Sequence, residues 1–233
     1  MVTARPARIR RDSRGRRLPP PPQRRTQKER SRATRLALMK AACEVIGEIG
    51  YAGATTAEIA RRAGVSRGAQ VHHYATKQQL VLAAADHVLS GVETEIEGIA
   101  RRLRQSERGT EVFIFDLWER VFSPANFQTI MELVAAARTD PVLKEMLSAR
   151  WVRLIQAYDA IWSRVPKHPG APSSDMETAL ALTLSLMRGL AFERIIRDNE
   201  PEYYRQLLKS WSGVVRHLMG RDGMAEGGRI ARP

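Results

Sequence analysis

Two short helices with well-marked ends follow one another between residues 55 and 74, and they constrain the fold more than any other feature. The T-T-A-E run from Thr55 to Glu58 has the spacing of a capping box, in which each of these two side chains bonds the other's backbone. Gly64 is placed to end this first helix in the left-handed conformation. Ser66 is placed to cap a second short helix that ends near Tyr74. Two capped helices joined by the A-G-V-S turn are typical of a helix-turn-helix.

Helical periodicity extends over most of the remaining chain, and no segment has the alternation of a strand. The predicted helices cover Arg30 to Gly50, Lys77 to about Leu103, and approximately 109–122, 125–138, 141–164, 174–198 and 201–219. The sequence therefore predicts an all-α protein with four regions. These are a disordered basic arm (1–28), an N-terminal helix-turn-helix head (29–76), a C-terminal helical bundle (77–219), and a flexible tail (220–233).

Positive charge is concentrated in the first third of the chain. Residues 1–75 carry 17 of the 38 basic and 5 of the 25 acidic side chains, which is +12 of the net +13. Such an asymmetry indicates a polyanionic partner, and favours nucleic acid over a membrane surface. The arm before residue 26 holds nine arginines opposed by Asp12 alone. It is predicted to follow the DNA backbone or enter a narrow minor groove; the alternatives are a solvated tail or a mis-assigned start codon.

Other classes of protein are disfavoured by what the sequence lacks. It contains no G-x-S-x-G elbow, phosphate-binding glycine loop or H-E-x-x-H motif, so we expect no enzyme. The single Cys43 permits no internal disulfide, and His72 and His73 without further spaced ligands predict no metal or cofactor. No apolar stretch approaches the ~20 residues that span a bilayer, and no secretory signal is recognisable, so we expect a cytoplasmic location and no membrane partner.

The segment from Leu38 to Leu80 resembles the DNA-binding domain of the TetR (tetracycline repressor) family of bacterial transcription regulators. The matching elements are Ala41-Ala42, Gly50-Tyr51, Thr55-Thr56, Ile59-Ala60, Gly64-Val65-Ser66, Gly68, Tyr74, Lys77 and Leu80. The resemblance implies that the head (29–76) is a three-helix DNA-binding domain, that the larger helical bundle (77–219) is a ligand-binding and dimerisation domain, and that the protein is a homodimer. The implied partners are a double-stranded DNA operator, a second copy of the chain and a small-molecule inducer.

The candidate DNA contacts lie on and around the second helix of the motif. In a major groove Arg pairs with guanine and Gln with adenine, which makes Arg67 and Gln70 the expected base contacts. Lys77 stands at a helix N-terminus, where a phosphate is favoured. The family commonly carries a phosphate-contacting tyrosine where this chain has Val71, so His72 or His73 is expected to substitute. The full candidate set is Thr55, Thr56, Ser66, Arg67, Gly68, Ala69, Gln70, His72, His73, Tyr74 and Lys77; simple caps and a solvated face are the alternative.

The body is predicted to hold an aromatic-lined pocket and a dimer interface, since twelve of the fourteen aromatic residues lie beyond residue 110. The pocket candidates are Phe113, Trp118, Phe127, Met131, Trp151, Tyr158, Met187 and Arg188, for which ordinary core packing is the alternative. Arg188 is expected to pair with Glu177, Glu193 or another carboxylate, or to anchor an acidic ligand. The segment 174–198 is apolar on two sides, which favours a second subunit as one cover. Its interface candidates are Leu182, Leu184, Leu186, Gly189 and Ala191.

The sequence therefore predicts a sequence-specific repressor, released from an inverted-repeat operator by a small apolar or aromatic ligand. The helix from Lys77 to Leu103, which joins head and body, is the predicted lever. The competing hypothesis is a nucleic-acid-binding protein without sequence preference, driven by the basic arm.

Overall fold

The computed structural model describes residues 26–103, 109–165, 173–197 and 201–220, and in these ranges every regular element is helical. In chain order the elements are α1 (Gln27–Gly53), α2 (Thr56–Arg62), α3 (Arg67–His73), α4 (Lys77–Leu103), α5 (Gly109–Asp116), the π-helix η1 (Leu117–Val121), α6 (Pro124–Ala136), α7 (Pro141–Trp162), α8 (Ser173–Ile196) and α9 (Pro201–Gly220). The predicted all-α fold is confirmed. The predicted arm up to residue 25 and the tail beyond residue 220 lie outside the described residues.

The first helix begins earlier than its apolar periodicity predicted. The Thr26 hydroxyl accepts a hydrogen bond from the Glu29 N–H at 3.2 Å, and the Glu29 carboxylate accepts one from the Thr26 N–H at 2.7 Å. This capping box starts α1 at Gln27, inside the segment assigned to the arm. The helix was predicted to end at Gly50. The structure has a break there, since Gly50 has a positive φ of 79°, and one further turn continues to Gly53.

The turn between α2 and α3 follows the predicted chemistry. The Gly64 N–H donates to the Arg61 carbonyl at 3.2 Å, and the Val65 N–H donates to the Ala60 carbonyl at 3.0 Å. With φ of 64° at Gly64, this pair of bonds is a Schellman motif. A Cβ at Gly64 would meet nothing within 4 Å, so the backbone conformation alone accounts for glycine here.

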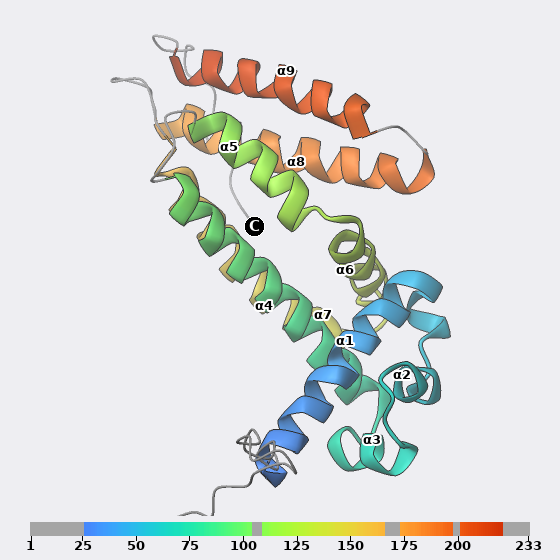
Figure 1. The fold of residues 1–233 in the computed structure, drawn as a ribbon. Helices are drawn as coiled ribbons and strands as arrows, with labels where there is room; N and C mark the ends of the chain where they lie inside the picture. The colour runs from blue at the N-terminus through green and yellow to red at the C-terminus, as the bar shows by residue number, and fades with distance from the viewer. Residues whose placement is uncertain (1–25, 104–108, 166–172, 198–200, 221–233) are drawn as a thin grey trace, which may run out of the picture.

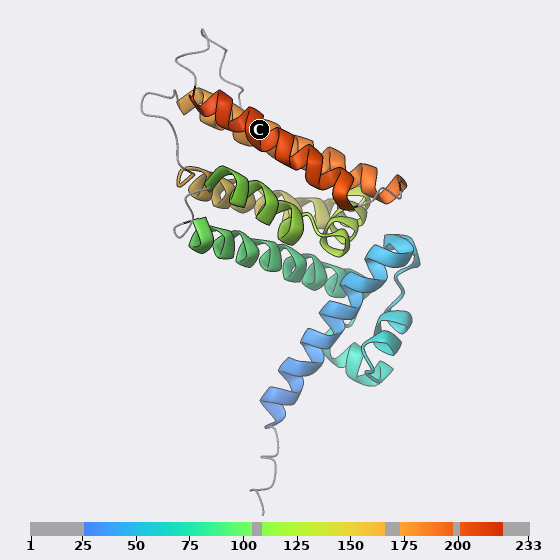
Figure 2. The ribbon, with the colours of Figure 1, turned by 45° about the horizontal axis from the view of Figure 1, so that its top comes forward.

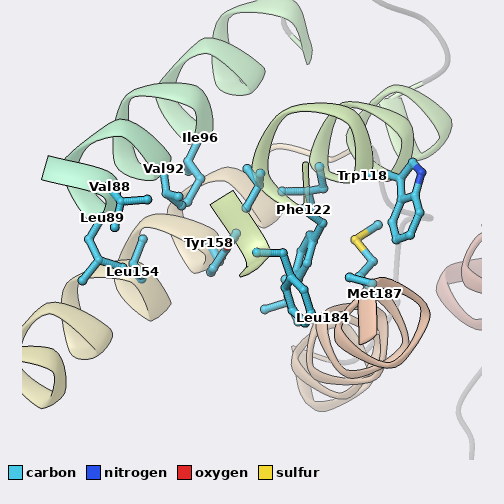
Figure 3. Packing of buried hydrophobic residues seen from close by; sticks show 14 of the residues in the cluster. Val88, Leu89, Val92, Ile96, Trp118, Phe122, Leu154, Tyr158, Leu184 and Met187 are labelled. Atoms are coloured by element: carbon cyan, nitrogen blue, oxygen red, sulfur yellow. The ribbon is translucent and has the colours of Figure 1, made fainter. Parts of the chain in front are cut away.

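The head and the body share helix α4. Figures 1 and 2 show α1, α2 and α3 gathered at one end, with α4 leading away from α3 into the body. In both views α8 and α9 lie side by side at the end of the body farthest from α3. One apolar core runs through the head and the body of the protomer. Figure 3 shows the part of it to which α4, α7 and α8 contribute Val92, Tyr158 and Met187.

Two further features of the body were not foreseen from the sequence. The predicted helix 109–122 divides into α5 and a π-helical turn at Leu117–Val121. Arg150 of α7 is only 9% exposed, and it lies 3.2 Å from the Asp86 carboxylate and 3.3 Å from the Glu93 carboxylate of α4. This guanidinium also bonds the Ser90 hydroxyl. A buried charge is stable only when it is paired in this way, so Arg150 fixes α7 against α4.

Candidate nucleic-acid interface

Helix α3 presents a mixed apolar and basic face to solvent. Ser66 begins the helix by accepting a hydrogen bond from the Ala69 N–H at 3.2 Å, as predicted. The side chains of Arg67, Val71 and His72 are exposed, and so is Gly68 between them. Val71 and His72 follow Arg67 and Gly68 by three, four or five residues, which is about one helical turn, so the two pairs share one side of the helix. This is the side that α3 offers to a partner.

Gln70 does not belong to that face, and its prediction as a base contact is wrong for this structure. It is 2% exposed, and its Nε2 donates to the Tyr74 carbonyl at 2.6 Å. The Tyr74 N–H in turn donates to the Gln70 carbonyl at 2.8 Å, so the two residues close the C-terminal end of α3. A long polar side chain in a seven-residue helix can face either way. The sequence could not show that the Tyr74 carbonyl would need the side chain of Gln70 as its hydrogen-bond donor.

The other predicted contacts of the motif surround α3. Thr55 is an exposed N-cap whose hydroxyl accepts from the Glu58 N–H at 3.1 Å, and Thr56 beside it is half-buried. The Glu58 carboxylate binds Arg61 at 2.6 Å rather than closing the capping box. Ala69 is half-buried as well. Their contacts with DNA stay a prediction.

Arg35 of α1, which the sequence analysis did not select, acts electrostatically on the C-terminal end of α3. Burial lowers the pKa of His73, and the charges of His72 and Arg35 lower it further. Burial raises the pKa of Tyr74, against the opposing effect of the same Arg35. Arg35 of α1 is therefore close enough to act electrostatically on both residues. The only signal in the sequence was the basic N-terminal part of α1, which includes Lys28, Arg30 and Arg32 as well.

Lys77 holds the end of α1 in addition to standing at the start of α4. Its Nζ donates to the Tyr51 carbonyl at 2.7 Å and lies 4.6 Å from the centre of the Tyr51 ring. Burial lowers its pKa. An ammonium group has three donors, so the predicted phosphate contact stays open to it. The structural role was not predicted, because Tyr51 lies 26 residues away in the chain.

Five of the predicted pocket residues are buried in the body. Phe113 packs against Trp162 with ring centres 4.9 Å apart, and Phe127 faces Phe122 at 6.3 Å. Trp118, which is labelled in Figure 3, stacks on Tyr204 with ring centres 5.3 Å apart. Tyr158 and Met187 are 9% and 0% exposed. These residues form an aromatic interior, and which of them line a ligand site stays a prediction.

Met131 and Trp151 are predicted incorrectly as interior residues, since they are 36% and 43% exposed. Trp151 is exposed on the side of α7 next to the one that carries its buried neighbour Arg150. The ion pairs of Arg150 turn that side of α7 toward α4, and successive residues on a helix point about 100° apart. Leu143 and Leu154 lie buried on the same side of α7 as Arg150, so apolar contacts and ion pairs together leave Trp151 on the exposed side.

Arg188 does not make the predicted ion pair within the described residues. Glu193 binds Arg197 instead, at 2.6 Å, and the Arg188 guanidinium donates to the Ser185 hydroxyl at 3.2 Å. Burial lowers the pKa of Arg188. Burial also raises the pKa of Tyr158, while the charge of Arg188 acts against that rise. The two side chains therefore influence each other between α7 and α8.

Helix α8 has apolar residues on two sides, as predicted, but two of the predicted interface residues lie on the side that packs inside the protomer. Leu184 and Ala191 are 8% and 1% exposed and pack inside the protomer. Leu182 and Gly189 face outward, and Leu186 is half-buried. The outward apolar residues of α8 and α9 that were not in the candidate set are Phe192, Ile195, Ile196, Tyr203 and Val214. The spacing marks both faces of such a helix but does not say which one the body covers.

Metal and membrane sites have no support in the described ranges. No group of three or more His, Cys, Asp or Glu residues there is arranged to hold a metal ion. Among the same residues, no helix has the length and apolarity needed to cross a bilayer.

A helical head with an exposed third helix, joined through a shared helix to a larger helical body, is typical of helix-turn-helix transcriptional regulators. The family model for bacterial regulatory proteins of the tetR family matches residues 38–84. The HTH-type transcriptional regulator CymR of Pseudomonas putida is 32% identical over 184 residues, which cover 79% of this chain and 90% of CymR. The chain belongs to the TetR family.

Solved structures have the same fold over most of their length. A protein described as a TetR-family transcriptional regulator of Mesorhizobium loti aligns with a TM-score of 0.67 at 18% identity, covering 81% of this chain and 96% of its own. The multidrug binding protein EbrR, complexed with malachite green, aligns with a TM-score of 0.55 at 18% identity, covering 80% and 98%. The predicted membership of a family of sequence-specific DNA-binding regulators is confirmed.

Proposed function

We propose that the protein is a cytoplasmic homodimeric repressor that binds an inverted-repeat operator through α3 and is released by a small apolar or aromatic ligand. The observation that carries this proposal is the pair of exposed surfaces at opposite ends of the protomer. One is the basic and apolar face of α3, and the other is the apolar face of α8 and α9. DNA binding and dimerisation are properties of the family.

The face of α8 favours a second copy of the chain as its cover. Leu182, Phe192 and Ile196 are 46%, 51% and 69% exposed, and with Gly189 they are spaced by three, four or seven residues. Nothing described in the protomer comes within 4 Å of a Cβ built at Gly189, so another helix can approach closely there. Val214, on the adjacent helix α9, is 45% exposed as well. Exposed apolar residues grouped on one face of a helix are typical of an interface between proteins.

A two-fold dimer presents two α3 helices to DNA, which supports an inverted repeat. Recognition helices in such dimers lie about one turn of DNA apart, roughly 34–36 Å, or a multiple of that distance. The proposed interface, which includes Leu182 and Leu186, does not cover the heads, because α8 and α9 are the helices farthest from α3 (Figure 1). Arg67 is the residue proposed to discriminate bases, and Lys77 and the caps are proposed to contact phosphates.

The aromatic interior supports the ligand part of the proposal. Trp118 is enclosed by Tyr204 on one side and by the Arg194 guanidinium, which lies 4.3 Å from its ring centre. EbrR has a similar fold and is complexed with malachite green, an aromatic compound of the kind proposed here. A ligand shifts the balance between two dimer arrangements only by the difference in its affinity for them. Helix α4 remains the proposed lever to the head.

The first experiment measures the oligomeric state. Phe192→Glu is expected to give a monomer by light scattering at micromolar concentration, because it places a charge in the apolar interface. Ile49→Glu is the matched control, since Ile49 of α1 has the same exposed fraction of 51% but lies in the head. Both variants should remain folded. A monomeric wild-type protein, or a Phe192→Glu dimer, contradicts the proposed interface.

The second experiment distinguishes the specific repressor from the competing hypothesis of binding without sequence preference. Footprinting on the region upstream of its own gene, with excess competitor DNA, is expected to give two symmetric protected half-sites. Binding driven by the arm alone gives no such footprint and a steep salt dependence, about 0.9 in log–log slope for each phosphate neutralised. Compounds that raise the melting temperature are then tested for release of that operator. If none of them releases it, the ligand part of the proposal fails.

A further inference from the structure

Val71 is an exposed apolar side chain in the middle of the surface that α3 offers to DNA. It is 48% exposed, and on the same side of the helix it is flanked by Arg67, Gly68 and His72. Valine is neither a strong helix former nor a residue that gains from solvation, so solvent exposure alone does not favour it here.

The core of the head does not use this side chain. The buried side of α3 is supplied by Gln70, and the hydrogen bonds that close the helix run between Gln70 and Tyr74. The neighbouring apolar contact in the turn is made by Val65, which is half-buried against the core. Val71 is therefore available to a partner, and the family's DNA-binding activity makes that partner the major groove.

The major groove has one apolar group with which a valine can pack. Each base pair presents hydrogen-bond donors and acceptors there, and thymine alone adds a methyl group at C5. We infer that Val71 selects thymine at one position of each half-site by packing against this methyl group. The inference deepens the proposed function and rests on it, since it concerns the operator that α3 binds.

The position of Arg67 places this thymine within the half-site. Arg67 and Val71 are four residues apart and lie on one side of α3. Their Cβ atoms are then about 5–6 Å apart, which is more than one and less than two base-pair steps. A guanine bound by Arg67 and the thymine bound by Val71 should therefore lie one or two base-pair steps apart.

The experiment removes the methyl group and the side chain independently. A duplex is enriched from a random pool with the full-length wild-type protein, and each thymine is then replaced by deoxyuridine, which keeps base pairing and lacks the methyl. At one thymine position, substitution in a single half-site is expected to lower the affinity of the wild-type protein about fourfold. Substitution of the same position in both half-sites is expected to lower it about fifteenfold. Val71→Ala should bind the thymine duplex more weakly and show no further loss with uracil.

Val142→Ala is the matched control, because Val142 is 46% exposed on α7 in the body. This variant should retain the wild-type sensitivity to uracil. Thermal unfolding of all variants verifies that each is folded. The inference is overturned if no uracil substitution weakens the wild type, or if Val71→Ala retains the same sensitivity at every position. If no duplex is enriched at all, it is the proposed function that fails, and the two failures are distinguishable.

Discussion

Replacing Gln70 by methionine separates the structural role of this side chain from the base contact that its sequence position suggests. Methionine has a similar length and is flexible enough to fill the same space, but it has no N–H donor. The Tyr74 carbonyl then loses the partner that lies 2.6 Å away in the wild type. If Gln70 is structural, the variant should lose stability and retain its base preference.

The magnitude follows from the burial of the two groups. Leaving a buried acceptor without its hydrogen bond costs about 1–3 kcal/mol. Gln70 is 2% exposed but Tyr74 is only half-buried, so water reaches part of the site and the lower end of that range applies. We expect a loss of about 1 kcal/mol, which corresponds to a melting temperature lower by roughly 2–4 °C for a chain of this length.

Arg67→Met is the matched comparison, because it introduces the same residue three positions earlier on the exposed side of α3. No ion pair or hydrogen bond of the Arg67 side chain is present within the described residues, so its removal should change stability by less than about 0.5 kcal/mol. It should instead reduce discrimination at one base position by about 1–3 kcal/mol.

The assay has two measurements on each variant at fixed salt and protein concentration. Thermal unfolding followed by circular dichroism gives the stability, and binding to duplexes with every single base change in one half-site gives the preference. The reasoning is refuted if Gln70→Met relaxes the preference at one base position while its melting temperature is unchanged.

One reaction and three substitutions test the packing of the head and its contact with the body. Burial raises the pKa of Cys43 from 9.0 to about 12, so at pH 8 its thiolate fraction should be about a thousandfold lower than in the unfolded chain. Alkylation by iodoacetamide, timed with and without urea, should slow by the same factor, and ionisation should destabilise the fold only above about pH 9, the unfolded pKa. Gly50→Ala should cost about 1–2 kcal/mol in chemical unfolding because its φ is +79°, whereas Gly91→Ala in α4, which has open space around it, should gain up to about 1 kcal/mol. Thr129→Val should cost about 1 kcal/mol by the same measurement, since the buried hydroxyl donates toward the Cys43 carbonyl at 2.9 Å; equal stability would show that this bond does not hold α6 to α1.

The parts of the fold that were predictable from the sequence depend on local chemistry. Thr55 and Ser66 bond amides three residues away, and Gly64 ends α2 through its own φ. Such interactions are fully specified by a short stretch of sequence. They therefore fix the helix-turn-helix without any knowledge of the rest of the chain.

The parts that were not predictable depend on partners distant in sequence or on the choice between two faces of a helix. Arg150 is buried because Asp86 and Glu93 lie across from it, some sixty residues earlier in the chain. Leu184 and Leu182 are identical in character, yet one packs inside and the other faces solvent. Periodicity gives the two faces of α8 equally, and only the position of its neighbours distinguishes them.

Tyr51 shows how the head is held to the body by more than the continuous helix α4. Its N–H donates to the Glu132 carboxylate of α6 at 3.0 Å, and its carbonyl accepts from Lys77 at the start of α4. Burial raises the pKa of Tyr51, and the charge of Asp140, to which its hydroxyl is hydrogen-bonded, raises it further. Asp140 also caps α7, by accepting from the Leu143 N–H at 3.0 Å. A displacement of α6 relative to α4 must therefore move the end of α1 or break one of these bonds. Since α1 packs on α2 and α2 packs on α3, we expect a displacement of α6 to change the orientation of α3 by this route as well as through α4.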